Sequence, residues 1–390
     1  MRRAVTTRPW LAVLVIYAAS RIVSTVLLGA VFVLATAQHW TFASYRSNPT
    51  FFTFSGSWDA SAYKTIAEHG YPLSLPLDSS GHVLPNPWAF LPVFPGIVRA
   101  VSSATGVGFY PAGVAAATVF GFGAALMLYR LLILRVPKRQ SLFAVVLFCV
   151  GPMGFLLQTA YAESTFLFFL FAALWCLATR RYLLLVPFAV VAAFTRPGVL
   201  ALALTLGVHF VVRLVASRRG RSVFPVRHMV SIVVAAAVVS VAGLAWPVIA
   251  TAVTHTPDAY LDTELSWWVG FVGRRHFAPL TPWFVMATTF VGWAGILLVL
   301  VVIAAGAFWL TRRSSRALGH EVVGFTASYW LYLVAVFLPQ QSLIRLMLPV
   351  APLLGSSVFS TTRRRRITAV SLGILLQAVA VVFLWFLGYP

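Results

Sequence analysis

The chain is predicted to be an all-α polytopic membrane protein. Hydrophobic residues make up 60% of the sequence and charged residues only 9%, against roughly 25% charged residues in a typical soluble domain. Apolar runs recur from end to end, and each is long enough to cross a hydrocarbon core of about 30 Å. Because lipid offers no partner to an exposed backbone group, each isolated span must be a helix.

The lengths of these runs predict about eleven transmembrane helices, within a range of about 10–13. The first run is too long for the apolar part of a signal peptide, so we expect it to be retained as an anchor. The fifth and sixth runs are short, and they could also form one broken helix and a partner. The runs are 9–37, 106–135, 139–157, 160–179, 181–195, 197–216, 227–253, 283–311, 321–338, 343–360 and 367–388.

The distribution of basic residues predicts the orientation. Most of the 29 Lys and Arg residues flank the ends of alternate spans, and the positive-inside rule places these turns in the cytoplasm. The N-terminus, with Arg2 and Arg3, is then cytoplasmic, and the two large loops 38–105 and 254–282 lie outside. The net charge of +21 is dispersed over membrane turns, which argues against nucleic-acid binding.

Acidic residues gather on the opposite side. Of the eight Asp and Glu residues, all but Glu321 fall in outer segments. Topology does not require this asymmetry, because acidic residues contribute little to orientation. Two explanations of the asymmetry remain. The outer loops are longer and need polar residues for solvation, or the outer face carries an active site.

The loop 38–105 contains a predicted short amphipathic helix that lies at the membrane interface. Ser57 is a suitable N-cap, Asp59 falls in the first turn, and Gly70 ends the helix. Asp59 and Tyr63 are four residues apart and share a face. Asp59 is therefore a candidate for acid–base chemistry, and the alternative is a carboxylate that partners the helix dipole.

Aromatic residues are frequent in both outer loops. Trp58, Tyr63 and Tyr71 surround Asp59 in the sequence, and Trp268 lies in the second loop. Aromatic faces beside polar groups suit sugar rings, but the same residues also suit an aromatic belt at the lipid headgroups.

Two further charged residues stand at membrane boundaries. Glu163 opens an apolar run, and a carboxylate in that place is expected to have a partner. Arg196 lies between two apolar stretches beside Pro197, where an anionic ligand or Glu163 would satisfy its charge. A structural ion pair is thus the alternative to ligand binding. Arg345 places another cation near the outer boundary.

No metal or cofactor is expected from the residue spacing. The eight histidines are scattered without the spacing of a metal site, and Cys149 and Cys176 both lie in apolar runs. We also find no glycine-rich phosphate loop.

Several short segments, in order along most of the chain, carry the most specific pattern in the sequence. They are Trp58-Asp59-Ala60 with Tyr63, Ile66-Ala67 and Gly70-Tyr71; Ala89 to Pro95; Gly151-Pro152 with Tyr161 to Ser164; Thr195 to Gly198; Trp268 to Phe271; and Arg345 to Pro349. Together they resemble the PIG-V family of membrane mannosyltransferases and its bacterial relatives, in the GT-C class of glycosyltransferases that use polyprenyl-phosphate sugars. Pro197 stands where that family usually has Ser, and the Asn of its motif is missing, so no role is carried over for those two.

The resemblance implies a GT-C-type fold in which residues 1–390 form a single integral membrane glycosyltransferase domain of a bacterial plasma membrane. The loop 38–105 would carry the catalytic motif on the extracytoplasmic face, together with interfacial helices. The enzyme would transfer mannose from polyprenyl-phosphate mannose to a glycolipid or glycan acceptor. Transfer would be inverting and metal-independent, without a cofactor.

The resemblance also implies roles for individual residues. Asp59 would be the general base that deprotonates the acceptor hydroxyl. Cations would stabilise the leaving phosphate, and Arg196, Arg345 and Lys64 are the candidates. The residues expected to bind substrate or support the site are Trp58, Tyr63, Tyr71, Tyr161, Glu163 and Trp268.

Two alternative functions stay open. One is a GT-C enzyme that uses another polyprenyl-phosphate sugar. The other is a transporter or flippase for lipid-linked or anionic substrates, which would be expected to place ionisable residues within the membrane. Only Arg21 lies clearly inside a predicted span.

Overall fold

The computed structural model describes residues 8–43 and 48–390, and these residues form an all-helical protein. Within these ranges there is no β-strand beyond a single bridge between Leu77 and Val83. The predicted all-α class is confirmed. Arg2, Arg3 and Arg46, which belong to the charge pattern of the sequence, lie outside the described residues.

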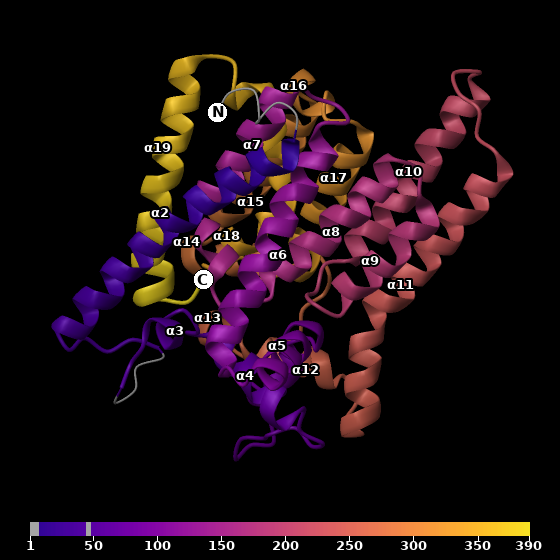
Figure 1. Cartoon of the computed structure of the whole chain (residues 1–390). Helices are drawn as coiled ribbons and strands as arrows, with labels where there is room; N and C mark the ends of the chain where they lie inside the picture. Colours follow the sequence, from indigo (N-terminus) through magenta and orange to yellow (C-terminus); the bar gives the residue numbers. More distant parts are fainter. Residues whose placement is uncertain (1–7, 44–47) are drawn as a thin grey trace.

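The helices follow one another along the chain as labelled in Figure 1. The first ones are α2 (Pro9–Ala37), α3 (Phe51–Phe54), α4 (Asp59–His69), η1 (Pro87–Ala89), α5 (Val93–Thr105), α6 (Phe109–Leu132), α7 (Lys138–Val150), η2 (Gly154–Gln158), α8 (Glu163–Ala178) and α9 (Tyr182–Ala193). They are followed by α10 (Leu200–Arg218), α11 (Val226–Thr254), α12 (Ala259–Ser266), α13 (Val269–Val272), α14 (Pro282–Val291), α15 (Ala294–Thr311), α16 (Arg313–Arg316) and α17 (His320–Val336). The last are α18 (Leu343–Leu346), η3 (Leu348–Gly355), η4 (Ser357–Phe359), α19 (Arg363–Ala380) and η5 (Val381–Phe386).

Six of the described helices are long and apolar enough to cross a membrane: α2, α6, α10, α11, α15 and the continuous segment Arg363–Phe386. Helices α8, α9 and α14 are apolar but shorter. Large apolar side chains such as Val241 on α11 and Val301 on α15 are exposed on the surface of the isolated chain. A helix that is apolar all round needs either a protein core or lipid, so these features are those of a polytopic membrane protein.

Two predicted spans are not continuous helices. The segment 283–311 divides into α14 and α15 at Gly292, whose φ of 65° lies in the left-handed region. The segment 343–360 forms only the short turns α18, η3 and η4, because Pro349 and Pro352 lack the backbone donor that a continuous helix requires. The prediction of an unbroken helix was wrong in both places.

The predicted span 139–157 is also interrupted, and Arg21 of α2 holds the break. Helix α7 ends at Val150, so its last carbonyls lack helical partners. Arg21 Nη2 donates to the Cys149 carbonyl at 2.9 Å, and Nη1 donates to the Gly154 carbonyl at 2.7 Å. Gln377 Nε2 donates to the Gly151 carbonyl at 2.8 Å. The ionisable residue inside the first span therefore completes the backbone hydrogen bonding of another helix.

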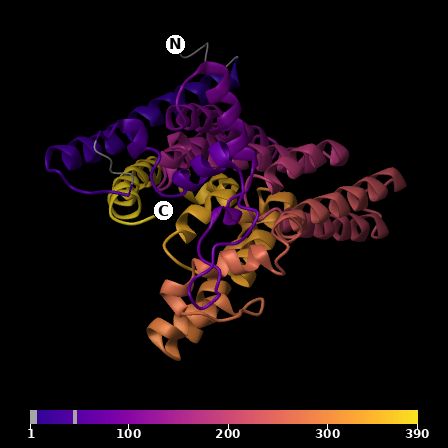
Figure 2. The same ribbon diagram turned by 90° about the horizontal axis from the view of Figure 1, so that it is seen from below.

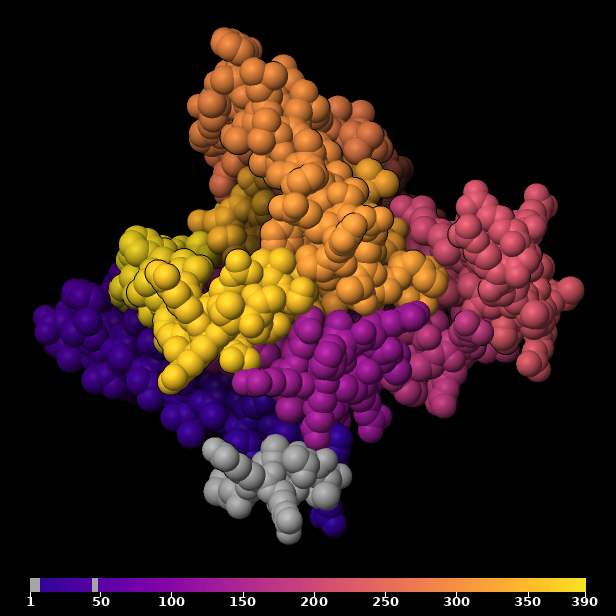
Figure 3. Space-filling view, turned by 90° about the horizontal axis from the view of Figure 1, so that it is seen from above, coloured from indigo at the N-terminus to yellow at the C-terminus, as the bar shows by residue number. Residues whose placement is uncertain are grey.

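The main hydrophobic core lies between α6, α8, α9, α10 and α17. The far ends of α10 and α11, and the pair α14–α15, extend outward from this body as two arms, as Figure 2 shows. Figure 3 shows the same arms from the opposite end of the molecule. Helices α4, α5 and α12 lie together at the end opposite α16 (Figure 1), and the candidate site is built there.

Helix α4 begins and ends almost as the sequence predicts. Asp59 is in its first turn and Gly70 follows its last residue, so both predictions are confirmed. The predicted N-cap was wrong by one residue, because Trp58 occupies the cap position with a φ of 57°. Ser57 Oγ instead donates a hydrogen bond to the Phe54 carbonyl at 2.9 Å.

Candidate functional site

Asp59 is placed by a tightly packed turn that precedes α4. A Cβ on Gly56 would lie 2.1 Å from a ring carbon of Tyr110, so a larger residue at this position would clash with that ring. Trp58 Nε1 donates to the Trp385 carbonyl at 2.8 Å, and the backbone N–H of Asp59 donates to the Tyr161 hydroxyl at 3.1 Å. These contacts fix the first turn of α4 against η5 and against the segment that leads into α8.

Four charged side chains meet at this point, and we call them the charged cluster: Asp59, Glu163, Arg196 and Arg345. Arg345 Nη1 lies 2.5 Å from Asp59 Oδ2, and Arg345 Nε lies 3.3 Å from Glu163 Oε1, an ion-pair contact without hydrogen-bond geometry. Arg196 Nη1 donates a hydrogen bond to the same Glu163 oxygen. The side chain of Glu163 is 4% exposed, and that of Asp59 is 21% exposed. Two carboxylates balance two guanidinium groups, which lowers the cost of burying them.

Each member of the charged cluster stands at or beside the end of a helix. Asp59 and Glu163 are the first residues of α4 and α8, where free backbone N–H groups favour a carboxylate. Arg196 lies in the turn between α9 and α10, and Arg345 lies in the short α18. The turn is close-packed, since a Cβ on Gly198 would lie 3.0 Å from a Tyr329 ring carbon. The predicted partnership of Arg196 with Glu163 is therefore present in the structure.

Two tyrosines line the charged cluster. Tyr63 is buried and makes edge contacts with the rings of Phe90, Phe94 and Tyr161. Burial raises the pKa of Tyr63 above its ordinary value, so its hydroxyl stays protonated. The guanidinium of Arg345 lies over the Tyr161 ring, 5.6 Å from its centroid, which adds a cation–π contact to the ion pairs.

Glu163 keeps one oxygen without a protein partner. Oε1 takes both arginine contacts, whereas the buried Oε2 accepts no hydrogen bond from any described residue. A buried carboxylate oxygen without a donor costs free energy. A hydroxyl of a bound molecule or of water would satisfy it, so Oε2 is a candidate contact for a ligand.

Glu264 of α12 is a further acidic residue near the cluster, and the sequence analysis did not select it. Burial raises the pKa of Glu264 to about 7. The hydrogen bond with Tyr260 and the positive charge of Arg196 lower this pKa, but their effect is smaller than that of burial. The charge of Asp59 also contributes to raising it. The only sequence signal was its place among the few outer acids.

The first outer loop packs on the second outer loop and on the end of α11. Asn86 Nδ2 of the first loop donates to Thr263 Oγ1 of the second at 2.8 Å, and Trp246 Nε1 of α11 donates to the Trp88 carbonyl at 3.0 Å. An ion pair between Arg274 and Asp78, with an N–O distance of 2.6 Å, joins the two loops at the surface. This packing is what brings α12 and Glu264 to the same end of the molecule as α4.

The remaining predicted site residues lie outside the charged cluster. Lys64 pairs with Glu68 at 3.5 Å on the outward face of α4 rather than approaching the two arginines. Tyr71 donates to the Phe90 carbonyl and packs on Trp88, in an aromatic cluster of the outer loops. Trp268 packs on Phe277 in a separate apolar group. Trp58 adjoins Asp59 but contacts Trp385 and Tyr389.

An apolar cavity of about 540 Å³ opens beside α18, the helix that carries Arg345. Ile344, Met347 and Leu348 line it from the sequence neighbourhood of Arg345, and further residues of α7 and the turn after it, of α15, of α17 and of η3 and η4 complete the wall. The lining is almost entirely apolar. The site therefore combines a charged cluster with an adjacent space suited to a hydrocarbon chain.

Comparison with models of protein families and with curated proteins finds no significant match to this chain.

Proposed function

We propose that the chain is a membrane glycosyltransferase of the GT-C type, which transfers mannose from polyprenyl-phosphate mannose to a glycolipid or glycan acceptor on the extracytoplasmic face. The charged cluster carries this proposal. Two of the eight acidic residues of the chain lie with two arginines at one end of the molecule, beside an apolar cavity. A lipid-phosphate sugar has matching parts, since it joins an anionic phosphate to a long apolar chain.

In the proposed reaction Asp59 is the general base. The acceptor oxygen attacks the anomeric carbon while its proton passes to the Asp59 carboxylate. The bond between that carbon and the phosphate oxygen breaks, and the electron pair leaves with the polyprenyl phosphate. Attack opposite to the phosphate inverts the configuration. A positioned base of this kind typically contributes about 10²–10⁴-fold to the rate.

Donor binding is proposed to release Asp59 for this role. In the structure Arg345 pairs with Asp59, so this carboxylate is engaged in an ion pair. A phosphate that binds Arg345 and Arg196 competes for their charge, which frees the carboxylate when the donor is in place. The same arginines then neutralise the charge that develops on the leaving phosphate.

The polyprenyl chain is proposed to occupy the apolar cavity, which lies next to Arg345 along α18. Glu163 is proposed to hold Arg196 and to accept a hydrogen bond from a sugar hydroxyl through its unpartnered Oε2. Lys64 has no part in this arrangement, because it faces Glu68.

We propose a GT-C-type fold with about eleven membrane crossings, and a bacterial plasma membrane as the location of the protein. The shorter helices α8, α9 and α17, the interrupted segment at α7 and the segment from α18 to η4 would cross together with the six long helices. The N-terminus would be cytoplasmic, which puts the charged cluster on the outer face.

The test is transfer of labelled mannose from polyprenyl-phosphate mannose by the purified protein in lipid vesicles. Asp59→Asn keeps the shape of the side chain but removes the base, so turnover should fall by about 10²-fold or more. Glu68→Gln, which alters an exposed carboxylate on the same helix, should leave turnover unchanged. Thermal unfolding of both variants separates loss of chemistry from loss of fold.

Near-normal turnover by Asp59→Asn would remove the general-base role. Parallel assays with other polyprenyl-phosphate sugars decide between mannose and another donor sugar. Mass spectrometry of lipid-linked glycans in a deletion strain, in which one glycolipid should lack a hexose, would identify the acceptor.

A further inference from the structure

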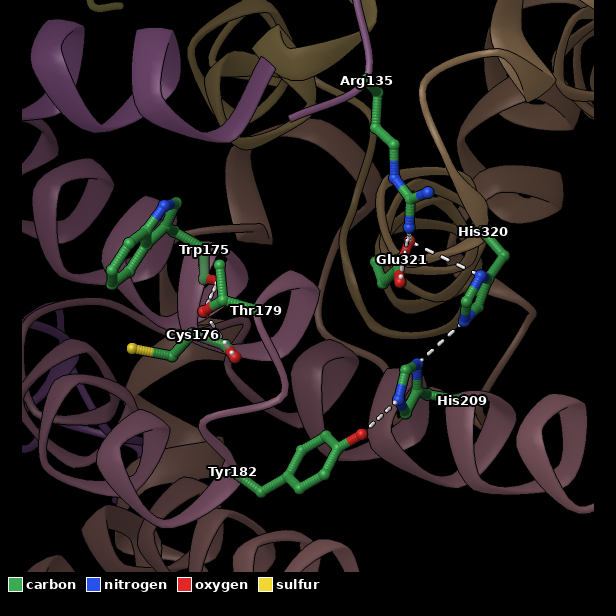
Figure 4. A network of polar contacts seen from close by, with 8 residues as sticks. All are labelled: Arg135, Trp175, Cys176, Thr179, Tyr182, His209, His320 and Glu321. Atoms are coloured by element: carbon green, nitrogen blue, oxygen red, sulfur yellow. Dashed lines mark hydrogen bonds and ion pairs between the residues drawn. The ribbon is translucent and has the colours of Figure 1, made fainter. Parts of the chain in front are cut away.

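A second polar cluster lies where α10 meets α17, away from Asp59, and the proposed reaction does not use it. Figure 4 shows its members in a chain from Arg135 through Glu321, His320 and His209 to Tyr182. His209 and Glu321 are buried, whereas the side chain of His320 is 37% exposed and so can be reached from the surface. These residues come from four segments that are distant in sequence.

Contacts within this cluster orient particular atoms toward one another. His209 Nδ1 faces His320 Nε2 at 2.9 Å, and the two rings are nearly parallel. The other nitrogen of His209, Nε2, lies 3.1 Å from the Tyr182 hydroxyl. One ligand atom each from His209, His320 and Glu321 lies within 4.8 Å of the other two.

We propose that His209, His320 and Glu321 form a binding site for a divalent transition-metal ion of the Zn²⁺ type. Two imidazole nitrogens and a carboxylate oxygen are a ligand set that Zn²⁺ takes, with a water in the fourth position. Two nitrogens on one tetrahedral zinc stand roughly 3.3 Å apart. The two nitrogens that face each other here therefore need to separate by only a few tenths of an ångström, while Glu321 moves toward them.

The surrounding residues act as supports for such ligands. The Tyr182 hydroxyl can accept the N–H of His209 Nε2, which leaves Nδ1 as the ligand atom. Arg135 Nη2 lies 3.1 Å from both Glu321 oxygens, so it restricts the directions in which that carboxylate can turn as it approaches the ion. Partners of this kind fix the orientation of metal ligands in proteins.

The charges of Arg135, Arg180 and Arg213 reach the histidines and oppose a dication. Glu321 neutralises one of these positive charges. The metal ion binds the neutral form of each imidazole, so the histidines add no further positive charge. The ion is therefore expected to bind at micromolar rather than nanomolar concentration, and to bind less tightly as pH falls and the histidines are protonated.

Such a metal ion would tie α10 to α17. The turn that precedes α10 carries Arg196, and Tyr329 of α17 donates a hydrogen bond to the Leu346 carbonyl, next to Arg345. Holding the two helices together would therefore fix the relative positions of the two arginines. The metal site does not depend on the proposed function, because its test measures binding and stability.

The test uses the full-length protein in detergent micelles, stripped of metal and titrated with ZnCl₂. We expect one zinc per chain by elemental analysis and a melting temperature that rises with zinc. His320→Ala, at a half-exposed position, and Glu321→Gln should each weaken zinc binding by tenfold or more. The matched control is His228→Ala, since His228 contacts the Tyr182 ring but offers no ligand atom to the site.

MgCl₂ should not replace zinc, because Mg²⁺ prefers oxygen ligands in an octahedral arrangement. Failure of the wild-type protein to bind zinc at micromolar concentration would overturn the proposal, and the contacts would then be a hydrogen-bonded chain only. The proposal would also fail if His320→Ala retained wild-type affinity, or if His228→Ala lost it.

Discussion

Arg345 is shared by two carboxylates, and this sharing links the ion pairs of the charged cluster into one network. It contacts Asp59 at 2.5 Å and Glu163 at 3.3 Å, while Arg196 contacts Glu163 from the other side. Removing one member of such a buried network leaves an unpaired charge and is strongly destabilising. Variants that keep the shape of the side chain are therefore the informative ones at these positions, and each needs a stability control.

Glu264 should make stability depend on pH. Its pKa is about 7 in the folded chain because of burial, above the ordinary value of 4.5. The folded state therefore binds the proton more tightly than the unfolded state does. The contribution to stability is fully present below about pH 4.5 and is lost as pH rises through about 7. Thermal unfolding between pH 4.5 and 8 should show this decline, and Glu264→Gln should flatten it.

Asp262→Asn, on the same helix, is the matched control for this measurement. An unchanged pH profile in Glu264→Gln would show that Glu264 does not hold a raised pKa. In the proposed enzyme, loss of the proton from Glu264 above about pH 7 would place a negative charge near Asp59. Transfer activity of the wild-type protein should therefore also change as pH rises through about 7.

At the scale of helices, the breaks in the membrane segments expose backbone carbonyls and position charged side chains that a continuous helix would not. The break after α7 leaves carbonyls that Arg21 and Gln377 satisfy, and the prolines after α18 divide the segment that carries Arg345. Arg21 thus has a structural explanation that does not require a transport pathway, which was the alternative that its position in the sequence left open.

Replacing Arg21 by Met should lower stability and leave donor binding intact. The Cys149 and Gly154 carbonyls would lose their donors, and each buried unpaired group costs about 1–3 kcal/mol. Thermal unfolding in detergent measures the loss. The matched control is Arg99→Met, since Arg99 is exposed on α5. A variant with wild-type stability would contradict the role of Arg21 at this break.

The cavity beside α18 can be filled from α15. Gly306 lines this cavity, and a Cβ on Gly306 would lie 3.0 Å from Trp330 Nε1, which is buried and has no hydrogen-bond partner among the described residues. Gly306→Leu should therefore raise the KM for a long-chain donor about tenfold or more, with much less effect on a short-chain analogue. Gly29→Leu is the control, because a Cβ on Gly29 meets no atom within 4 Å. Equal effects on both donors would show that the chain binds elsewhere.

At the scale of the whole molecule, the opposite ends of the helix bundle differ in chemistry. The outer-loop helices α4, α5 and α12 lie at one end, while α16 and the arginine-rich start of α19 lie at the other (Figure 1). By the positive-inside rule the second end faces the cytoplasm. This orientation is a prediction, because nothing in the packing of the helices sets the direction of the membrane.

Cysteine labelling in intact cells tests the orientation. Thr65→Cys and Asp258→Cys are exposed positions at the end that carries the charged cluster, and an impermeant thiol reagent should label both from outside. Arg219→Cys, after α10, should be labelled only after permeabilisation. The native Cys149 and Cys176 are buried, so their background should be low. Reversed labelling would overturn the orientation and the outer location of the charged cluster.

The sequence by itself determined the class of this protein and indicated which residues were candidates for the functional site. Hydropathy and run length predict membrane helices because the bilayer imposes both on any spanning segment. The scarcity of carboxylates pointed to Asp59 and Glu163, and the unusual basic positions pointed to Arg196 and Arg345. Such local signals need no knowledge of which helices touch.

Tertiary structure alone decided which of these residues meet. Asp59 and Arg345 are 286 residues apart in sequence, and only helix packing joins them. Packing also brought Glu264 near the charged cluster and placed His209 against His320. Contacts of this kind depend on how helix ends are stacked and interrupted, and no periodicity in the chain encodes that arrangement.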